Sequence, residues 1–447
     1  MRREREFIVK FQRVVVLLAG AWVFPHLTGI SQGAPLDPVF AMVPFDRWLA
    51  EGGQGPFHWS AHVAPADLSN HQRLRVRVEL SLDGSDLVSR RGEGYMMMLV
   101  QLEDADHRIY QSHESLDLQQ VTEAAAKTNI VYTQDIFVRP GDYRVGLMVV
   151  DSKTGEHGAA EKTLHVNPLK NDPFPGAWQD LPAVEFVPAA TAPDNLPMPA
   201  STRRLQLPLE SRRPLRLEIL VNVSPTLSQL GLHSGPANNR SLIELLPALN
   251  VMSQVEVRNG TLNVSLLDLT RRQVVFEQEK LGDLDWPLLR TGLGAADPNK
   301  IDVRSLAHRE RNAQFFVEQV RERILGAAGA QSPPPGEPLR IGIVLSGPMG
   351  FASGEDLHPI EAAERSGRRI YYFRYHSLPP PLMTPPSLYA LRGRRNMPPP
   401  LGRPLSLEPL DSLVPLIKPL QPRVFDIFSP EQFRKALSTM LEELSRL

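Results

Sequence analysis

The sequence predicts a multidomain protein in which an antiparallel β-sandwich precedes a doubly wound α/β domain. In the first part, apolar and polar residues alternate with a period of two, which is typical of half-buried strands. In the second part, continuous apolar runs are separated by amphipathic helical patterns, which favours a central, mostly parallel sheet of six strands in a Rossmann-like fold. A proline-rich stretch separates the two parts.

The composition is that of a globular chain with an unusual amount of proline. Of 447 residues, 42% are hydrophobic and 22% are charged, which allows a sizeable core. The 49 basic and 50 acidic residues give a net charge of -1, which argues against a nucleic-acid partner. Proline accounts for 42 residues, and this indicates long irregular connections. The chain contains no cysteine, so a disulfide framework is excluded.

The first 33 residues resemble an export signal. A basic leader precedes the short apolar run Val14–Phe24, and Ser31 and Gly33 provide small residues before a cut at Ala34. We therefore expect residues 1–33 to be a signal peptide and the mature chain to be extracytoplasmic, either periplasmic or secreted. Retention of the segment as an anchor is the alternative, but its apolar run is shorter than the ~20 residues of a membrane span. After cleavage we expect no stable membrane span.

Residues 43–167 are predicted to form the sandwich. Aromatic residues at 44–48 and 57–59 are expected to pack an N-terminal arm onto it. Pro140-Gly-Asp-Tyr143 resembles the entry to a late strand in immunoglobulin-like and fibronectin-like domains, where a tyrosine bonds back to the backbone. The predicted strands are Leu74–Leu80, Tyr95–Leu102, Ile130–Val138, Tyr143–Val150 and Ala160–Val166.

Residues 168–214 are predicted to be an extended proline-rich linker that touches the domains without being a domain itself. Few apolar residues in it recur with a regular period. We expect this segment to be the place where proteolysis separates the two halves, near Arg213.

Residues 215–447 are predicted to form the α/β domain. Ser241 begins a capping-box pattern, and Ser429, Pro430 and Gln432 mark the start of the last helix. A helix over Val303–Leu325 carries one apolar face for packing on the sheet. The predicted strands are Leu215–Val221, Thr261–Leu269, Gln273–Gln278, Leu339–Leu345, Arg369–Tyr375 and Arg423–Phe428.

A long insertion, residues 378–422, lies between the last two predicted strands. It contains two triple-proline runs and the basic stretch Arg392–Arg395. A segment of that length without structure of its own is either functional or disordered. We interpret the basic stretch as solvated surface, and we expect no nucleic-acid binding.

The loop after the first strand of this domain is the main candidate site. Asn222, Ser224 and Thr226 follow the apolar run directly. In an open α/β sheet, ligands gather at the carboxyl ends of the central strands. The alternative is that these side chains only cap the loop and the start of the next helix.

The order of the six strands, with a tight hairpin between the second and third, resembles the von Willebrand factor type A (VWA) family. The whole chain is similar to secreted bacterial VWA-related proteins. In that family, Asp-x-Ser-x-Ser after the first strand, a later Thr and a later Asp form a metal-ion-dependent adhesion site for Mg²⁺ or Mn²⁺. The corresponding positions here are Asn222, Ser224, Thr226, Thr291 as a candidate, and Ser346-Gly347.

Both carboxylates of the family's metal site are therefore replaced. Mg²⁺ dehydrates reluctantly and is usually held by one or two carboxylates, so neutral oxygens alone would bind it weakly. We expect a degenerate site with no metal, and no Mg²⁺ or Mn²⁺ cofactor.

No enzyme motif stands out in the sequence. Ser353 lies in Gly-Phe-Ala-Ser-Gly, which misses the nucleophile-elbow spacing. The sequence therefore favours a non-catalytic, exported protein-interaction or adhesion-type module whose partner is another protein. A secreted hydrolase with an unrecognised site is the alternative. An exposed apolar surface at the carboxyl edge of the sheet would favour binding, whereas a pocket around an activated nucleophile would favour hydrolysis.

Overall fold

The computed structural model describes residues 36–53, 55–187, 204–224, 240–295, 311–326, 337–351, 360–361, 368–376 and 411–447. The described residues are rich in β-structure, and their strands form sheets of four, five, two and six strands. The chain divides into two compact units. Unit 1 contains most of residues up to 170 together with 182–188, and unit 2 contains residues 68–73, 171–181 and the chain from 189 onward.

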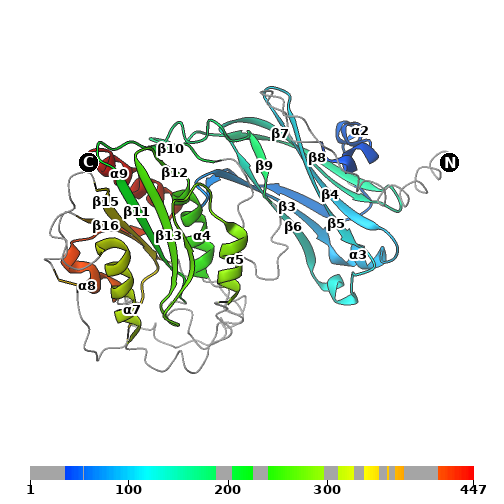
Figure 1. Cartoon of the computed structure of the whole chain (residues 1–447). Coiled ribbons are helices and arrows are strands. Elements are labelled where there is room, and N and C mark those ends of the chain that lie inside the picture. Colours follow the sequence, from blue (N-terminus) through cyan, green and yellow to red (C-terminus); the bar gives the residue numbers. More distant parts are fainter. Residues whose placement is uncertain are drawn as a thin grey trace, which may run out of the picture. The chain divides into compact units, whose positions relative to one another are not determined.

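Unit 1 is an antiparallel β-sandwich (Figure 1). One sheet has the order β1-β3-β6-β9, with the short β2 paired to β3, and the other has the order β5-β4-β7-β8. On β3 every second residue is buried, as the alternating sequence predicts. The strands are β1 (Trp59–Val63), β2 (Asp67–Leu68), β3 (Leu74–Asp83), β4 (Tyr95–Asp104), β5 (Ile109–Asp117), β6 (Asn129–Val138), β7 (Gly141–Asp151), β8 (His157–Val166) and β9 (Val184–Phe186).

Among the described residues, four short helices accompany the sandwich strands. η2 (Pro38–Met42) and α2 (Phe45–Glu51) pack on the sheet through Phe40 and Phe45. α2 is the first part of the expected N-terminal arm, whereas Trp59, in the second part, begins strand β1. A Cβ on Gly146 would lie 2.9 Å from a methyl of Leu49, so this glycine allows the arm to approach β7 closely. The remaining helices are α3 (Gly84–Ser89) and η3 (Glu123–Lys127).

Tyr143 makes the backbone contact that the sequence predicts. Its hydroxyl donates to the carbonyl of Arg139 at 2.9 Å and lies 3.3 Å from that of Ala183. Burial raises the pKa of Tyr143 to about 12. The neutral hydroxyl therefore ties the start of β7 to the backbone at Arg139 and Ala183.

The main sheet of unit 2 has the order β14-β13-β11-β15-β16-β17. All neighbouring pairs are parallel except the β13–β14 hairpin. A second, two-stranded sheet pairs β10 with β12 in parallel. The strands are β10 (Leu207–Leu209), β11 (Leu215–Asn222), β12 (Val255–Val257), β13 (Gly260–Asp268), β14 (Gln273–Gln278), β15 (Leu339–Ser346), β16 (Arg369–Tyr375) and β17 (Arg423–Ile427).

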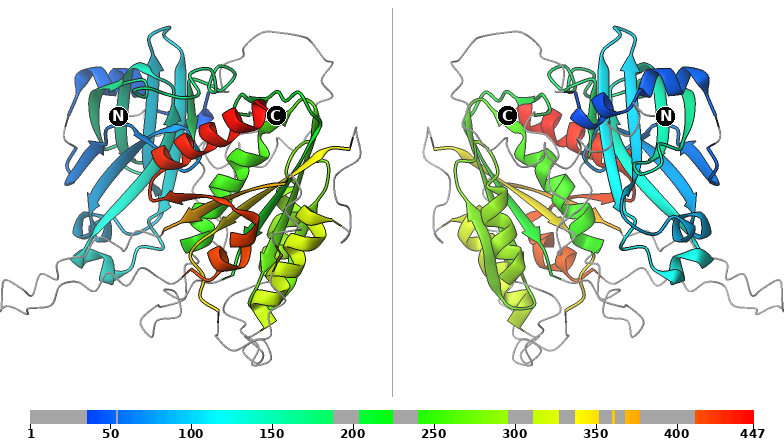
Figure 2. Two further views of the ribbon diagram at one scale, coloured as in Figure 1. Left: turned by 90° about the vertical axis from the view of Figure 1, so that its left-hand side faces the viewer. Right: turned by 90° about the vertical axis from the view of Figure 1, so that its right-hand side faces the viewer.

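Helices cover both faces of this sheet (Figure 2). On one face, α7 (Arg311–Val320), the π-helical turn η5 (Arg321–Leu325) and α8 (Leu413–Ile417) pack against Leu220, Val344 and Tyr372. On the other, α4 (Arg240–Ser253) and α9 (Pro430–Ser445) contact β16, where Phe373 meets Phe433 edge to face. α5 (Trp286–Ala295) lies against β14.

Two helix predictions need adjustment, and a third is confirmed. The helix expected over Val303–Leu325 is described only from Arg311, and its last turn is π-helical. Ser241 lies inside α4 and does not precede it, because the helix already includes Arg240. Ser429 is the N-cap of α9 as predicted, with its hydroxyl accepting from the Gln432 amide.

The end of the predicted insertion 378–422 is helical. α8 and η8 (Lys418–Leu420) occupy it, whereas residues 377–410 lie outside the described part of the chain. Leu413 and Ile417 are fully buried in the same core as α7. The apolar spacing of Leu413, Leu416, Ile417 and Leu420 is that of a helix, and the surrounding prolines conceal it.

The stretch expected to be a linker, residues 168–214, contains ordered elements. β9 pairs with β6 in unit 1, and β10 pairs with β12 in unit 2. Residues 171–181 pack on α9, where the buried Arg434 binds both carboxylate oxygens of Asp172 at 2.7 and 2.9 Å. The Arg434 guanidinium also lies over the rings of Phe174 and Trp178. Its aromatic residues therefore anchor this segment within unit 2.

Candidate functional site

The candidate site lies where the order of strands in the unit 2 sheet reverses. β11 is central, the chain continues to β13 on one side, and it later returns to β15 on the other. Asn222 ends β11 and Ser346 ends β15, so both lie at the carboxyl edge on either side of this point. Ligands of open α/β sheets bind in such a crevice.

Asn222 joins β11 to the neighbouring strand β15 at the position of the expected crevice. Its side-chain amide nitrogen donates to the Ser346 hydroxyl at 2.8 Å and lies 3.3 Å from the sulfur of Met349. Its carbonyl oxygen accepts from the amide of Ser224 at 3.1 Å. The side chain is buried, and all its polar atoms have protein partners. Asn222 therefore presents an N–H donor to Ser346 where a metal site needs an oxygen.

The two serines are also engaged in structural bonds. Ser224 accepts a hydrogen bond from the amide of Leu269 at 2.7 Å, and Ser346 donates to the carbonyl of Gly347 at 2.7 Å. Thr226 lies outside the described residues. Thr291 is exposed on α5, where its hydroxyl donates to the carbonyl of Pro287 at 2.9 Å. Within the described part of the chain, the site thus brings together Asn222, Ser224 and Ser346.

Asp411 belongs to this site, and sequence reasoning missed it because it lies within the proline-rich insertion. Its side chain is 3% exposed. It accepts hydrogen bonds from the Tyr372 hydroxyl at 3.0 Å, from the Leu413 amide at 3.1 Å and from the Met349 amide at 3.3 Å. Burial, reinforced by the Asp411 charge and hydrogen bond, raises the pKa of Tyr372 well above its usual value. Asp411 therefore fixes the start of α8.

Four side chains form a cluster on the next two strands, at the carboxyl ends of β16 and β17. Arg374 pairs with Asp426, which faces it in the strand register, at 2.6 Å. His376 lies 2.7 Å from the same carboxylate oxygen of Asp426. Burial alone would raise the pKa of Asp426, but hydrogen bonds from Arg374 and His376 outweigh it and hold this pKa below its usual value. Asp426 is therefore anionic at neutral pH.

Phe428 completes this cluster and is exposed. Its ring stacks on the imidazole of His376, with centroids 4.3 Å apart and an interplanar angle of 10°. The residue is 45% exposed, although the backbone around it is fixed. Its amide donates to the side chain of Gln432 at 2.7 Å, just before the N-cap of α9. A large aromatic side chain is thus held at the carboxyl edge without being covered.

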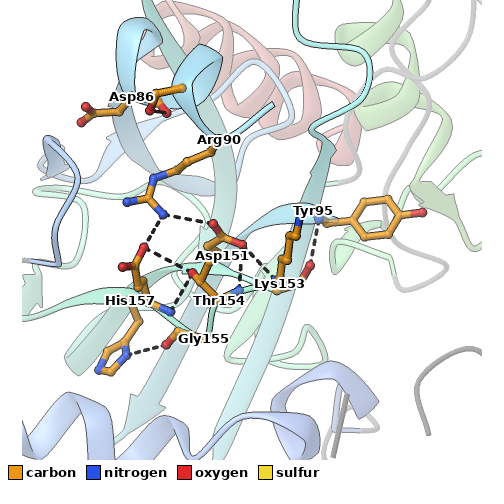
Figure 3. A network of polar contacts seen from close by, with 11 residues as sticks. Asp86, Arg90, Tyr95, Asp151, Lys153, Thr154, Gly155 and His157 are labelled. Carbon is orange, nitrogen blue, oxygen red and sulfur yellow. Dashed lines mark hydrogen bonds and ion pairs between the residues drawn. The ribbon is translucent and has the colours of Figure 1, made fainter. Parts of the chain in front are cut away.

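A second polar network, in unit 1, is structural (Figure 3). Arg90 bonds Glu156 and, at 3.1 Å, one carboxylate oxygen of Asp151. The other oxygen of Asp151 accepts from the amides of Lys153 at 2.9 Å and Thr154 at 3.3 Å. These bonds close the turn between β7 and β8 and leave neither oxygen of Asp151 without a partner.

The described residues contain no group of three or more His, Cys, Asp or Glu side chains placed to hold a metal ion. None of the helices in the described ranges is both long and apolar enough to cross a membrane. The apolar run Val14–Phe24 lies outside those ranges.

Comparison with known proteins does not assign a family. No protein-family model matches the chain, and no curated protein matches it. Among solved structures, it is similar to a structural-genomics target assigned as an ApaA protein of Bordetella pertussis, with 15% identity over 26% of this chain and 100% of that one and a TM-score of 0.16. It is also similar to the pilus adhesin SpaC of Lactobacillus rhamnosus GG, with 10% identity over 70% of this chain and 34% of that one and a TM-score of 0.24.

Proposed function

We propose that this protein is an exported, non-catalytic interaction module that binds a partner protein through the carboxyl edge of the unit 2 sheet. The observation that carries the proposal is Phe428, an exposed aromatic side chain on a fixed backbone beside an ionised carboxylate. Aromatic anchors of this kind contribute much of the binding energy in protein interfaces.

We also propose that unit 2 is VWA-like and that its adhesion site has lost its metal. The strand order and the single antiparallel edge strand support the first part. The bond from Asn222 to Ser346 supports the second, because it joins the two strands that a metal would otherwise bridge. The interaction surface then lies along the same edge, on the next two strands, β16 and β17.

The hydrolase alternative needs a nucleophile activated by a base. In the described part of the chain, the Ser224 and Ser346 hydroxyls bond to a backbone amide, to Asn222 and to a backbone carbonyl. This arrangement favours the binding function.

A pull-down from the extracytoplasmic fraction tests the proposal. The mature chain, its Phe428→Ala variant and a Leu288→Ala control are immobilised, since Leu288 is an apolar residue on α5 that is also exposed, at 54%. We expect one protein to be retained by the wild type and the control, and its affinity to fall at least tenfold with Phe428→Ala. Equal retention by all three proteins would refute the assigned surface.

The export prediction has its own measurement. N-terminal sequencing of the protein from its native host should give a chain that begins near Ala34. A chain that begins at Met1 in the cytoplasm would contradict export.

A further inference from the structure

We infer that the partner presents a basic side chain, arginine or lysine, to Phe428 and Asp426. This inference rests on the proposed function and specifies the chemistry of the partner at the same surface. It differs from the family's adhesion chemistry, in which a metal ion takes part in binding.

The four side chains of the cluster lie on the same face of the sheet. Arg374 faces Asp426 across β16 and β17, and His376 continues β16 to lie beside Phe428. On these strands, Ile370 and Tyr372 are buried under α7 and α8, on the face that also carries Arg374 and His376. Beyond the helices the same face becomes charged and partly exposed, so it is accessible along the carboxyl edge.

The carboxylate of Asp426 is only partly used by its neighbours in the protein. One oxygen of Asp426 accepts both from Arg374 and from His376. No contact of its other oxygen occurs among the described residues, and the side chain is 44% exposed. Arg374 also contacts the buried Asp411, so its single positive charge is shared between two carboxylates. Asp426 therefore presents an exposed carboxylate oxygen to a partner.

The aromatic ring of Phe428 is also available to a partner. His376 stacks on one face of Phe428, and the residue remains 45% exposed. A cation held over an aromatic face is attracted by the ring, and a neighbouring carboxylate adds Coulomb attraction. Because Gln432 and the start of α9 fix the backbone at Phe428, little ordering is needed when a partner binds.

The test uses a fluorescein-labelled hexa-arginine peptide and its hexa-citrulline analogue, which keeps the shape but lacks the charge. Fluorescence anisotropy at about 0.15 M salt measures binding to the mature full-length chain, so that screening limits general charge attraction. We expect saturable binding of hexa-arginine and no binding of hexa-citrulline.

Substitutions at Phe428 separate cation–π attraction from simple apolar contact. Phe428→Trp should bind hexa-arginine more tightly than wild type, and Phe428→Leu should bind it less tightly. The affinity of the wild type should exceed that of Phe428→Leu by about three- to tenfold. Asp426→Asn should weaken binding by at least threefold, whereas Glu256→Gln, at an exposed acidic residue on β12, should leave it unchanged. Thermal melts of each variant verify folding.

Several results would overturn the inference. These are equal affinities for the Trp, Phe and Leu variants, equal binding of hexa-citrulline, or saturable binding of hexa-glutamate that Phe428→Leu abolishes. If retention in the pull-down depends on Phe428 but hexa-arginine binding does not, the inference of a basic partner is wrong. The proposed interaction surface is then still supported. If neither depends on Phe428, both proposals fail.

Discussion

At the scale of single residues, the choice of Asn222 decides what the crevice can hold. Its amide nitrogen donates to Ser346 and Met349, and its side-chain oxygen accepts from the Ser224 amide. An aspartate would keep the last bond but would offer no donor to Ser346 unless protonated. It would also place a charge at a site that is 3% exposed. The amide thus suits a closed, metal-free crevice.

Asn222→Asp should lower the free energy of unfolding at pH 7 by about 3 kcal/mol, because it leaves a buried charge without a cation. Burial would raise the pKa of this new carboxyl in the folded state, so the loss should shrink as the pH falls and the carboxyl becomes protonated. Urea denaturation between pH 4 and 7 measures this. A variant as stable as wild type at pH 7 without metal would contradict the closed-crevice account.

Tyr143→Phe removes the hydroxyl that bonds the Arg139 carbonyl, and it should cost about 1 kcal/mol in unit 1. The folded pKa of Tyr143 is about 12, above the ~10 of an unfolded tyrosine, so its contribution is complete below pH ~10 and is lost toward pH 12. The difference in alkaline absorbance between wild type and variant should titrate near pH 12. A titration near pH 10 would show that Tyr143 is not buried.

At the scale of elements, the π-helical turn η5 packs on a glycine of β15. A Cβ on Gly342 would lie 2.4 Å from the terminal methyl of Ile324. Ile324 is fully buried in the core shared by α7 and α8. The absence of a side chain at Gly342 therefore sets how closely this helix approaches the sheet.

Gly342→Ala should destabilise unit 2 by about 1–3 kcal/mol through overpacking. Ile324→Val in the same protein should recover part of that loss, because it removes the methyl that the new Cβ meets. A double-mutant cycle by chemical denaturation measures the coupling. Additive effects of the two substitutions would mean that η5 does not pack on β15 in this way.

The sequence predicts elements well where local pattern and tertiary packing agree. The strand prediction at Arg369–Tyr375 is confirmed, as are the β13–β14 hairpin and the cap of α9. α8 is not predicted because the helix is only five residues long and lies among prolines. Asp411 is not predicted as a site residue because its partners, Tyr372 and Met349, are distant in sequence. The bonds between Asn222 and Ser346 depend on the sheet order, which local pattern alone does not fix.

At the scale of the whole molecule, unit 2 includes more of the chain than the sequence boundary at residue 215 implies. Residues 171–181 are anchored by Arg434, and β10 pairs with β12. The Arg204 guanidinium also bonds the carbonyl of Ser253 at 3.0 Å. These contacts bury apolar residues such as Leu205, Leu207 and Trp178.

A fragment of residues 169–447 should therefore be more stable than one of residues 213–447. The shorter fragment leaves Arg434 buried without Asp172, which should cost about 3 kcal/mol or more. Thermal melts compare the melting temperatures of the two fragments. Arg434→Met in the longer fragment should bring its melting temperature closer to that of the shorter one. Equal melting temperatures would show that residues 171–209 contribute nothing to the fold of unit 2.

Calorimetric titration of the purified protein with Mg²⁺ and Mn²⁺ tests most directly whether protein hydrogen bonds close the crevice. We expect no saturable heat from wild type, because neutral oxygens already engaged by Asn222 and Leu269 cannot replace the water around a hard cation. Asn222→Asp combined with Gly347→Asp should gain saturable binding, since it supplies the two missing carboxylates. Micromolar binding by wild type that disappears in Ser224→Ala would contradict the account.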